Sequence, residues 1–283
     1  MLSYRHAFHA GMHADVLKHS VLVHLLQYLA QKDKAFWCID THAGAATYAL
    51  RGEYARKNAE FETGIGRLWG RTDLPALLEP YMQQVRALNS GSGGALHHYP
   101  GSPWLAERLL RKQDRLRLFE LHSTEIKLLQ DHFRRAAPRV IAQAGDGFVG
   151  LLSLLPPPPR RGLVLVDPSY EDKNDYRRVI AALRGALERF ATGTYAVWYP
   201  QVRRLEAREL PEKLERVQAS GWLHVTLTVK APPADGLGIY GSGFFILNPP
   251  YTLPGLLKQG MPYLVKVLGQ DETARFSLES RIE

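Results

Sequence analysis

Residues 163–170 read LVLVDPSY, and residues 36–44 read FWCIDTHAG. Each stretch begins with an unbroken apolar run, and an aspartate follows that run directly, Asp167 in the first stretch and Asp40 in the second. Strands that are covered on both faces of a parallel sheet have this continuously apolar pattern, whereas half-exposed strands alternate. The two stretches therefore predict neighbouring buried strands, each with an acid at its carboxyl end.

Strand and helix patterns alternate through most of the chain. Strands are predicted at 35–40, 115–120, 139–143, 163–167, 194–199, 223–229 and 243–247, and helices at 12–31, 103–111, 124–135, 148–155, 175–190 and 204–219. This alternation predicts crossover units and a mostly parallel sheet. The last two strands are joined without a helix, which predicts an antiparallel hairpin at the sheet edge. We expect an α/β fold with a seven-stranded sheet.

Residues 47–99 break the alternation with short helical patterns separated by Gly and Pro. This segment separates elements of a single sheet, so we interpret it as an inserted helical subdomain. The core is then formed by residues 1–46 and 100–283. Within that core, residues 1–20 form a separate N-terminal segment, which we expect to contact substrate and cofactor.

The composition favours a polyanionic partner. Lys and Arg number 36 against 28 Asp and Glu, which gives a formal charge of +8. A basic balance of this size is typical of nucleic-acid binders. Cys38 is the one cysteine, so a disulfide within the chain is excluded. The polar N-terminus and the lack of a long apolar run predict a soluble, cytoplasmic protein without a membrane span.

Four acids are expected at or just after strand ends, namely Asp40, Glu120, Asp146 and Asp167. In an open parallel sheet, ligands bind outside the carboxyl ends of the strands, at the point where the strand order reverses. We therefore expect the four side chains to converge on one pocket. Glu120 follows the second strand of the sheet, where a carboxylate can accept hydrogen bonds from both ribose hydroxyls.

The loop at residues 40–46, DTHAGAA, has one glycine rather than the three of the dinucleotide fingerprint. A pyrophosphate needs close backbone approach at several points, and this loop does not provide it. The loop therefore disfavours a nicotinamide cofactor and permits S-adenosylmethionine.

The turn Asp167-Pro168-Ser169-Tyr170 matches a clamp for an exocyclic adenine amine. The amine is a poor nucleophile because its lone pair is delocalised into the ring, and carboxylate and carbonyl acceptors on its hydrogens favour attack. An aromatic ring such as Tyr170 would hold the base by stacking, worth about 1–3 kcal/mol. Proline fixes the turn, so the acceptors are preorganised.

A second candidate clamp lies at Asn248-Pro249-Pro250-Tyr251. It fits the Asn/Asp-Pro-Pro-aromatic pattern better, and it would suit a glutamine methyltransferase. If strand 243–247 is antiparallel, however, its carboxyl end points away from the cofactor. We therefore favour Asp167 and interpret Asn248 as a turn residue.

The N-terminus is rich in histidine, with His6, His9, His13, His19 and His24. The spacing of His9 and His13 is compatible with a helical metal site. No Glu follows in the metalloprotease arrangement and no cysteine is near, so we predict no metal. Together with Tyr4, Arg5 and Lys18, the segment is better suited to phosphates and a stacked base.

Several stretches together carry a resemblance to a known family. They are MLSYRHAFHAG at 1–11, HADVLKH at 13–19, DTHAG at 40–44, YPGSP at 99–103, RRGL at 160–163, ATG at 191–193 and WYP at 198–200. Over nearly its whole length the chain resembles the RlmJ family of bacterial 23S ribosomal RNA adenine-N6 methyltransferases. The resemblance implies a Rossmann-like class I methyltransferase fold with a small helical insertion.

The resemblance also implies site residues and their roles. Contacts to S-adenosylmethionine are implied for His19, His42, Ser102, Glu120, Asp146, Gly147 and Asp167. Asp167 would be the catalytic acceptor at the amine. Tyr4 would meet the RNA, with His6 and Lys18 nearby and Tyr170 against the base. The implied substrate is 23S ribosomal RNA, free or in an assembly particle.

The chain departs from the family pattern at Met12 (usually Asn), Ala46 (usually Gly) and Ser169 (usually Pro), and only Ser169 bears on the rigidity of the clamp. Three rival functions stay open at this point. A DNA adenine-N6 methyltransferase would use the same clamp, and a glutamine methyltransferase would use Asn248. An RNA chaperone with an inactive methyltransferase fold would bind no cofactor.

Overall fold

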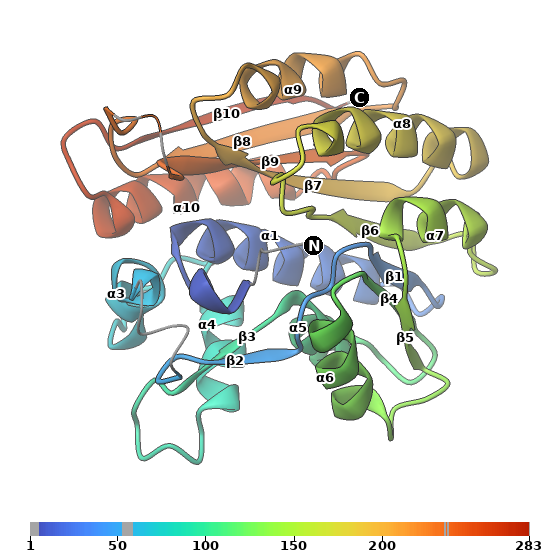
Figure 1. The fold of residues 1–283 in the computed structure, drawn as a ribbon, viewed down its shortest axis with the longest axis horizontal. Coiled ribbons are helices and arrows are strands. Elements are labelled where there is room, and N and C mark those ends of the chain that lie inside the picture. Colours follow the sequence, from blue (N-terminus) through green and yellow to red (C-terminus); the bar gives the residue numbers. More distant parts are fainter. Residues whose placement is uncertain (1–5, 53–58, 235, 237, 283) are drawn as a thin grey trace.

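The computed structural model describes residues 6–52, 59–234, 236 and 238–282 (Figure 1). Its main sheet has eight strands in the order β10-β8-β9-β7-β6-β1-β4-β5. The strands are β1 (Trp37–Asp40), β4 (Arg115–Glu120), β5 (Val140–Ala144), β6 (Gly162–Val166), β7 (Thr194–Gln201), β8 (Trp222–Thr228), β9 (Gly241–Leu247) and β10 (Arg275–Arg281).

The strand order reverses between β1 and β6. From β1 the chain continues to β4 and then β5 on one side, while β6 and β7 lie on the other side, all five parallel. Leu163 pairs with Cys38 and Leu165 with Asp40 in this register. The carboxyl ends of β1 and β6 therefore open side by side at the position where such sheets bind ligands.

Helices cover both faces of the sheet (Figure 1). One face carries α1 (His13–Ala30), α5 (Ser102–Leu109) and α10 (Leu253–Leu268), with α6 (Ser123–Phe133) beside α5 along β4 and β5. The other face carries α7 (Gly147–Ser153), α8 (Asn174–Arg189) and α9 (Leu205–Glu215). Strand β6 is buried along its whole length because helices pack on both of its faces.

Two predictions about the far side of the sheet were wrong. The sheet has eight strands, because β10 pairs with β8 and forms the edge. Strands β8 and β9 do pair antiparallel, as predicted, but β9 lies between β7 and β8 instead of at an edge. Strand β10 was missed because an exposed edge strand needs few apolar residues; its sequence, RFSLESR, carries only Phe276 and Leu278.

The segment between β1 and α5 begins and ends on a small two-stranded sheet. Strand β2 (Thr47–Ala49) pairs antiparallel with β3 (His98–Pro100), and between them lie η2 (Glu60–Thr63), α3 (Gly66–Trp69) and α4 (Glu79–Leu88). Helix α4 packs against α1. The division of the chain into a core and an inserted subdomain at residues 47–99 stays a prediction.

Helix α1 is enclosed by the main sheet and by helices α4 and α5. It contacts β6 and β9 of the sheet, and on other sides α4 and α5. Its first half is therefore buried all round, although it carries His13, Asp15, Lys18 and His19. Buried polar side chains need partners, and Lys18 finds one in Asp167 at the carboxyl end of β6.

Candidate active site

A cavity of about 290 Å³ opens at the carboxyl ends of the parallel strands. Its walls come from α1, from the loops after β1, β4, β5 and β6, and from the start of α5. The lining includes His6, Met12, Asp15, Lys18, His19, Thr41, His42, Gly44, Tyr48, Ser102, Glu120, Glu125, Asp146, Gly147, Asp167, Pro168, Ser169, Asp172, Asp175, Arg178 and Trp198. It lies at the reversal of strand order between β1 and β6.

Three of the four acids at strand ends reach this cavity, and Asp40 does not. Glu120, Asp146 and Asp167 line it, whereas Asp40 is buried beneath, where it accepts hydrogen bonds from Ser102 Oγ (2.7 Å) and from the backbone N–H of His42 (3.2 Å). Burial raises the pKa of Asp40 to about 6. The expected convergence of all four acids is thus corrected: Asp40 supports the loop and the helix start that form the wall.

Glu120 is held in place by two backbone donors. Its Oε2 accepts from the N–H of Gly44 at 2.7 Å, and its Oε1 accepts from the N–H of His122 at 2.6 Å. Gly44 has a φ of +61°, which favours glycine. Each carboxylate oxygen retains acceptor capacity beyond these bonds. The side chain can therefore accept two hydroxyl groups of a ligand without moving.

Asp146 caps helix α7 and pairs with an arginine that the sequence reasoning missed. Its Oδ1 accepts from the N–H of Phe148 at 3.0 Å, and its Oδ2 pairs with Arg178. The next residue, Gly147, lies against the loop after β1, where a Cβ would sit 1.8 Å from the carbonyl oxygen of Thr41. Only glycine permits this approach, which brings the start of α7 to the cavity wall.

Asp167 is tied to helix α1 through Lys18. Lys18 Nζ lies 2.6 Å from Asp167 Oδ2 and 2.9 Å from Asp15 Oδ1. Asp15 Oδ2 in turn accepts from the backbone N–H of Gly11 and lies 2.9 Å from His6 Nε2. Burial raises the pKa of Asp167, and the charge and hydrogen bond of Lys18 oppose that rise.

This chain of contacts bears on the expected role of Lys18. The ammonium is buried and lies between two carboxylates; burial alone would lower its pKa, but Asp15 and Asp167 raise it. Lys18 is therefore charged and already paired with two carboxylates, and its role at the RNA stays a prediction. His6 lines the cavity beside it, and Tyr4 lies outside the described residues.

The two histidines predicted to contact the cofactor line the cavity as neutral rings. Burial lowers the pKa of His19 and of His42 to about 3. His19 Nδ1 lies 2.8 Å from Tyr99 Oη, and His42 Nδ1 lies 2.8 Å from Thr41 Oγ1. Among the described residues, His19 Nε2 has no hydrogen-bond partner although it is buried.

Tyr170 is not placed to stack on a base. Its ring is buried, packs 4.5 Å from the ring of Tyr176, and its hydroxyl donates to the carbonyl oxygen of Trp198 at 2.7 Å. A φ of +54° turns the chain at this point and directs the ring away from the cavity. The prediction for Tyr170 is corrected because its side chain fastens the turn to β7 instead.

Trp198 provides an aromatic ring on the cavity wall, which sequence reasoning did not identify. It comes from β7, and Lys18 Nζ lies 5.6 Å from its ring centroid. Its indole Nε1 is buried without a hydrogen-bond partner among the described residues. The signal in the sequence was a tryptophan in the strand beside 163–167, but the face that it occupies depended on the register.

Asn248 lies at the other end of the sheet. Its amide donates to the carbonyl oxygens of Ala191 (2.8 Å) and Gly193 (2.7 Å), which precede β7, and its Oδ1 accepts from Ser220 Oγ at 2.8 Å. These groups surround the amino ends of β7 and β8. The interpretation of Asn248 as a turn residue is confirmed, since its amide is used to fasten loops.

Within the described parts of the chain, no group of three or more His, Cys, Asp or Glu side chains is arranged to hold a metal ion. His9 Nδ1 instead pairs with Glu60 at 2.8 Å. No helix in those parts is both long and apolar enough to cross a membrane.

The fold and site define a class I methyltransferase. Residues 33–281 match the family described as "Ribosomal RNA large subunit methyltransferase D, RlmJ". A relative from Haemophilus influenzae named "Ribosomal RNA large subunit methyltransferase J" is 43% identical over 279 residues, 99% of this chain and 98% of the relative. An Escherichia coli relative of the same name is 44% identical, covering 93% of each chain.

A crystal structure of a protein from Legionella pneumophila has the same fold. It superposes with a TM-score of 0.87 at 36% identity and covers 96% of this chain and 98% of its own. The chain described here belongs to the RlmJ family of ribosomal RNA large subunit methyltransferases.

Proposed function

We propose that this protein transfers a methyl group from S-adenosylmethionine to the exocyclic N6 amine of an adenine in 23S ribosomal RNA. The observation that carries the proposal is the position of Asp167, at the end of β6 in the cavity where the strand order reverses. The names of the relatives support the ribosomal RNA substrate. The adenine amine follows from the chemistry of the turn after β6.

The residues that line the cavity fit S-adenosylmethionine. The buried Nε2 of His19, which lacks a partner among the described residues, and the N-terminus of α5 at Ser102 suit the ligand's carboxylate. Glu120 suits the ribose hydroxyls. His42, Asp146 and Gly147 lie on the wall beyond Glu120, where they suit the adenine. When bound, the cofactor supplies an electrophilic methyl group on a positively charged sulfur.

The charge of the lining also favours a cationic cofactor. Seven carboxylates line the cavity, against the two cations Lys18 and Arg178. A sulfonium ion is stabilised by a surplus of carboxylates in a partly enclosed site, where charges interact more strongly than in bulk water.

Asp167 orients the target amine as a hydrogen-bond acceptor. Lys18 occupies Oδ2, whereas no hydrogen bond to Oδ1 is found among the described residues. Oδ1 can therefore accept a hydrogen bond from the amine, which localises the lone pair on the nitrogen and makes it available for attack on the methyl carbon. The charge and hydrogen bond of Lys18 favour the ionised carboxylate and oppose the rise in the pKa of Asp167 that burial causes. Catalysis then consists mainly of alignment, which is worth several kcal/mol in well-oriented reactions.

The target adenine must leave its stack to reach Asp167, which costs a few kcal/mol and favours an unpaired nucleotide. We infer that Trp198, in place of Tyr170, contacts the base, because it lines the cavity together with Asp167. Ser169 keeps the turn closed without a second proline: its Oγ accepts from the N–H of Glu171 at 3.4 Å. His6, which lines the cavity, and Tyr4 are proposed to meet the RNA.

Methyl incorporation into nucleic acid tests the proposal. Purified protein is incubated with labelled S-adenosylmethionine and ribosomal RNA from cells that lack it, and the modified nucleotide is mapped by mass. The expected product is N6-methyladenosine at one position in 23S ribosomal RNA, with DNA of the same sequence unmodified. Transfer to DNA alone would support the DNA methyltransferase instead. The absence of both methyl transfer and cofactor binding, the latter measured by calorimetry, would support the inactive chaperone.

A further inference from the structure

The excess positive charge of the chain is concentrated at the end of the sheet that lies opposite the cavity. Here the chain enters β1, β4, β5 and β6, and we call the residues 31–36, 107–117, 131–139 and 154–161 the basic rim. It contains the 12 bases Lys32, Lys34, Arg108, Arg111, Lys112, Arg115, Arg117, Arg134, Arg135, Arg139, Arg160 and Arg161, and the four acids Asp33, Glu107, Asp114 and Asp131.

The rim therefore has a net charge of +8, as large as that of the entire chain. The rest of the chain balances at 24 basic and 24 acidic residues. The cavity differs in sign, with seven carboxylates against two cations in its lining. Its lining suits a sulfonium ion but repels phosphate, so long-range attraction for a polyanion has to come from another surface.

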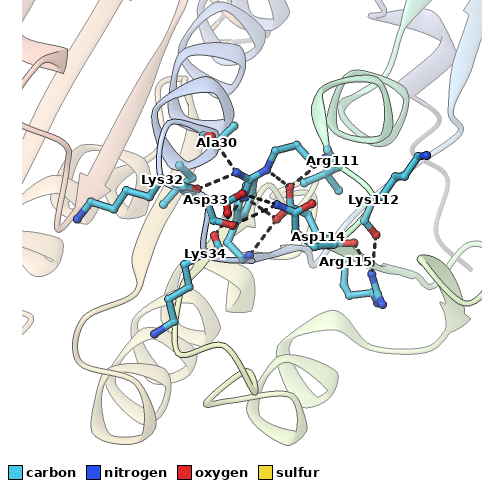
Figure 2. A network of polar contacts seen from close by, with 12 residues as sticks. Ala30, Lys32, Asp33, Lys34, Arg111, Lys112, Asp114 and Arg115 are labelled. Atoms are coloured by element: carbon cyan, nitrogen blue, oxygen red, sulfur yellow. Dashed lines mark hydrogen bonds and ion pairs between the residues drawn. The ribbon is translucent and has the colours of Figure 1, made fainter.

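Part of the rim charge has a structural role. Arg111 pairs with buried Asp114 at 2.9 Å and donates to the carbonyl oxygens of Ala30, Lys32 and Lys34, which close the end of α1 (Figure 2). Arg161 donates to the carbonyl oxygen of Leu29 in the same way. Arg111 thus holds the loop before β1 against the loop before β4, and Arg161 holds the end of α1 against the loop before β6.

Two further rim arginines are paired, Arg139 with Glu107 and Arg134 with Asp131, but four other rim cations extend into solvent. Figure 2 shows the side chains of Lys32, Lys34 and Lys112 extending away from the Arg111–Asp114 network. All three are exposed, as is Arg135, and none of the four has an ion-pair partner among the described residues. These four cations come from three separate loops, and exposed cations spread in this way suit the many phosphates of a nucleic-acid backbone better than a single small anion.

We propose that the basic rim binds the phosphate backbone of the substrate RNA at a second place, remote from the target adenine. The proposal rests on the function proposed above. Strand β4 has six residues, so the rim lies roughly 20 Å from the cavity mouth at ~3.3 Å per residue. A contact at that distance requires a folded RNA that extends beyond the target nucleotide. The rim thus favours large RNA over short fragments.

A matched pair of variants tests the rim. The rim variant replaces Lys32, Lys34, Lys112 and Arg135 by Gln, and the control variant replaces Arg184, Arg208, Lys258 and Lys266, which are exposed on α8, α9 and α10. Both lose the same charge. Binding to a domain-sized fragment of 23S ribosomal RNA is measured at several salt concentrations, together with methyl transfer at saturating RNA.

The rim variant should bind the RNA roughly 10- to 100-fold more weakly, and its slope of log K against log salt should be shallower by about 3. Its kcat at saturating RNA should stay at the wild-type level, and the control variant should bind like wild type. Equal weakening in both variants, or none in the rim variant, overturns the proposal. If wild-type protein transfers no methyl group, the proposed function fails, while the binding comparison still decides the role of the rim.

Discussion

Lys18 Nζ and Asp167 Oδ2 lie 2.6 Å apart and are separated by 149 positions in the sequence. Their ion pair joins the buried half of α1 to the turn after β6. Asp15 and His6 extend it to the N-terminal segment. The acid proposed to act on the substrate is thus positioned by the segment that is proposed to meet the RNA.

Replacing Asp167 by Asn should remove activity without removing the fold. The amide can still accept a hydrogen bond from Lys18, but it lacks the charge that draws the amine hydrogen. We expect kcat to fall by at least roughly 100-fold, the usual scale for a positioned proton acceptor. Methyl transfer is measured at saturating cofactor, with circular dichroism as the control for folding. Wild-type kcat in this variant would rule out the assigned role.

Replacing Lys18 by Met should destabilise the protein because it leaves two buried carboxylates without their shared cation. The expected loss is about 3–5 kcal/mol, typical for breaking a buried pair from one side. The double variant Lys18→Met, Asp167→Asn should recover about 1–3 kcal/mol of it. Urea unfolding of the single and double variants measures both values. Strictly additive losses would show that the pair is not coupled.

Replacing Glu120 by Gln should weaken cofactor binding. Gln keeps one acceptor oxygen, but its NH₂ group faces either Gly44 N–H or His122 N–H, which both donate to the native carboxylate. We expect the Kd for S-adenosylmethionine to rise roughly 10- to 100-fold, or about 1.4–2.7 kcal/mol. Isothermal calorimetry gives the Kd. Exposed Glu188→Gln on α8 is the matched control, and an unchanged Kd in both would refute the ribose assignment.

Asn248 should matter for stability and not for turnover. Its φ of +52° and its bonds to Ala191, Gly193 and Ser220 make it a loop fastener. Asn248→Gly keeps the backbone conformation, but its free energy of unfolding should be about 1–3 kcal/mol lower because those hydrogen bonds are lost. Asn248→Ala should lose about 1 kcal/mol more, because Ala disfavours positive φ. Both should retain wild-type kcat at low temperature; a selective loss of kcat would revive the clamp at residues 248–251.

Acid should destabilise the protein in part through His224. Burial lowers its pKa to about 4 in the fold, while its Nε2 lies 2.7 Å from Tyr199 Oη. Between pH 6.5 and 4 the unfolded chain takes up a proton that the folded chain does not, so this contribution is complete above pH 6.5 and is lost as pH falls toward 4. Between pH 7 and pH 5, the free energy of unfolding of His224→Gln should therefore fall by about 2 kcal/mol less than that of wild type. Denaturant titrations at both pH values measure the difference, and parallel losses would contradict it.

The central sheet could be predicted because its strands are buried on both faces and therefore apolar throughout, as in β1 and β6. Strand β10 and helix α10 could not. The first is an exposed edge with alternating polar residues, and the second contains Pro254 and Pro262, which usually mark breaks. Asp40 and Asp167 end neighbouring strands in the same sequence pattern, yet only Asp167 lines the cavity, because the start of α5 covers Asp40 through Ser102.

The sequence alone determined the order of the buried strands and of the helices between them, the acids at strand ends and the family, because these depend on local patterns and on motifs along the chain. The tertiary structure decided which side chains face the cavity. The positive φ of Tyr170 turned its ring into the core, the register of β7 placed Trp198 on the cavity wall, and the packing of α1 placed Lys18 against Asp167. It also decided that the surplus positive charge gathers at the end of the sheet opposite the acidic cavity, since only folding brings four separate loops together.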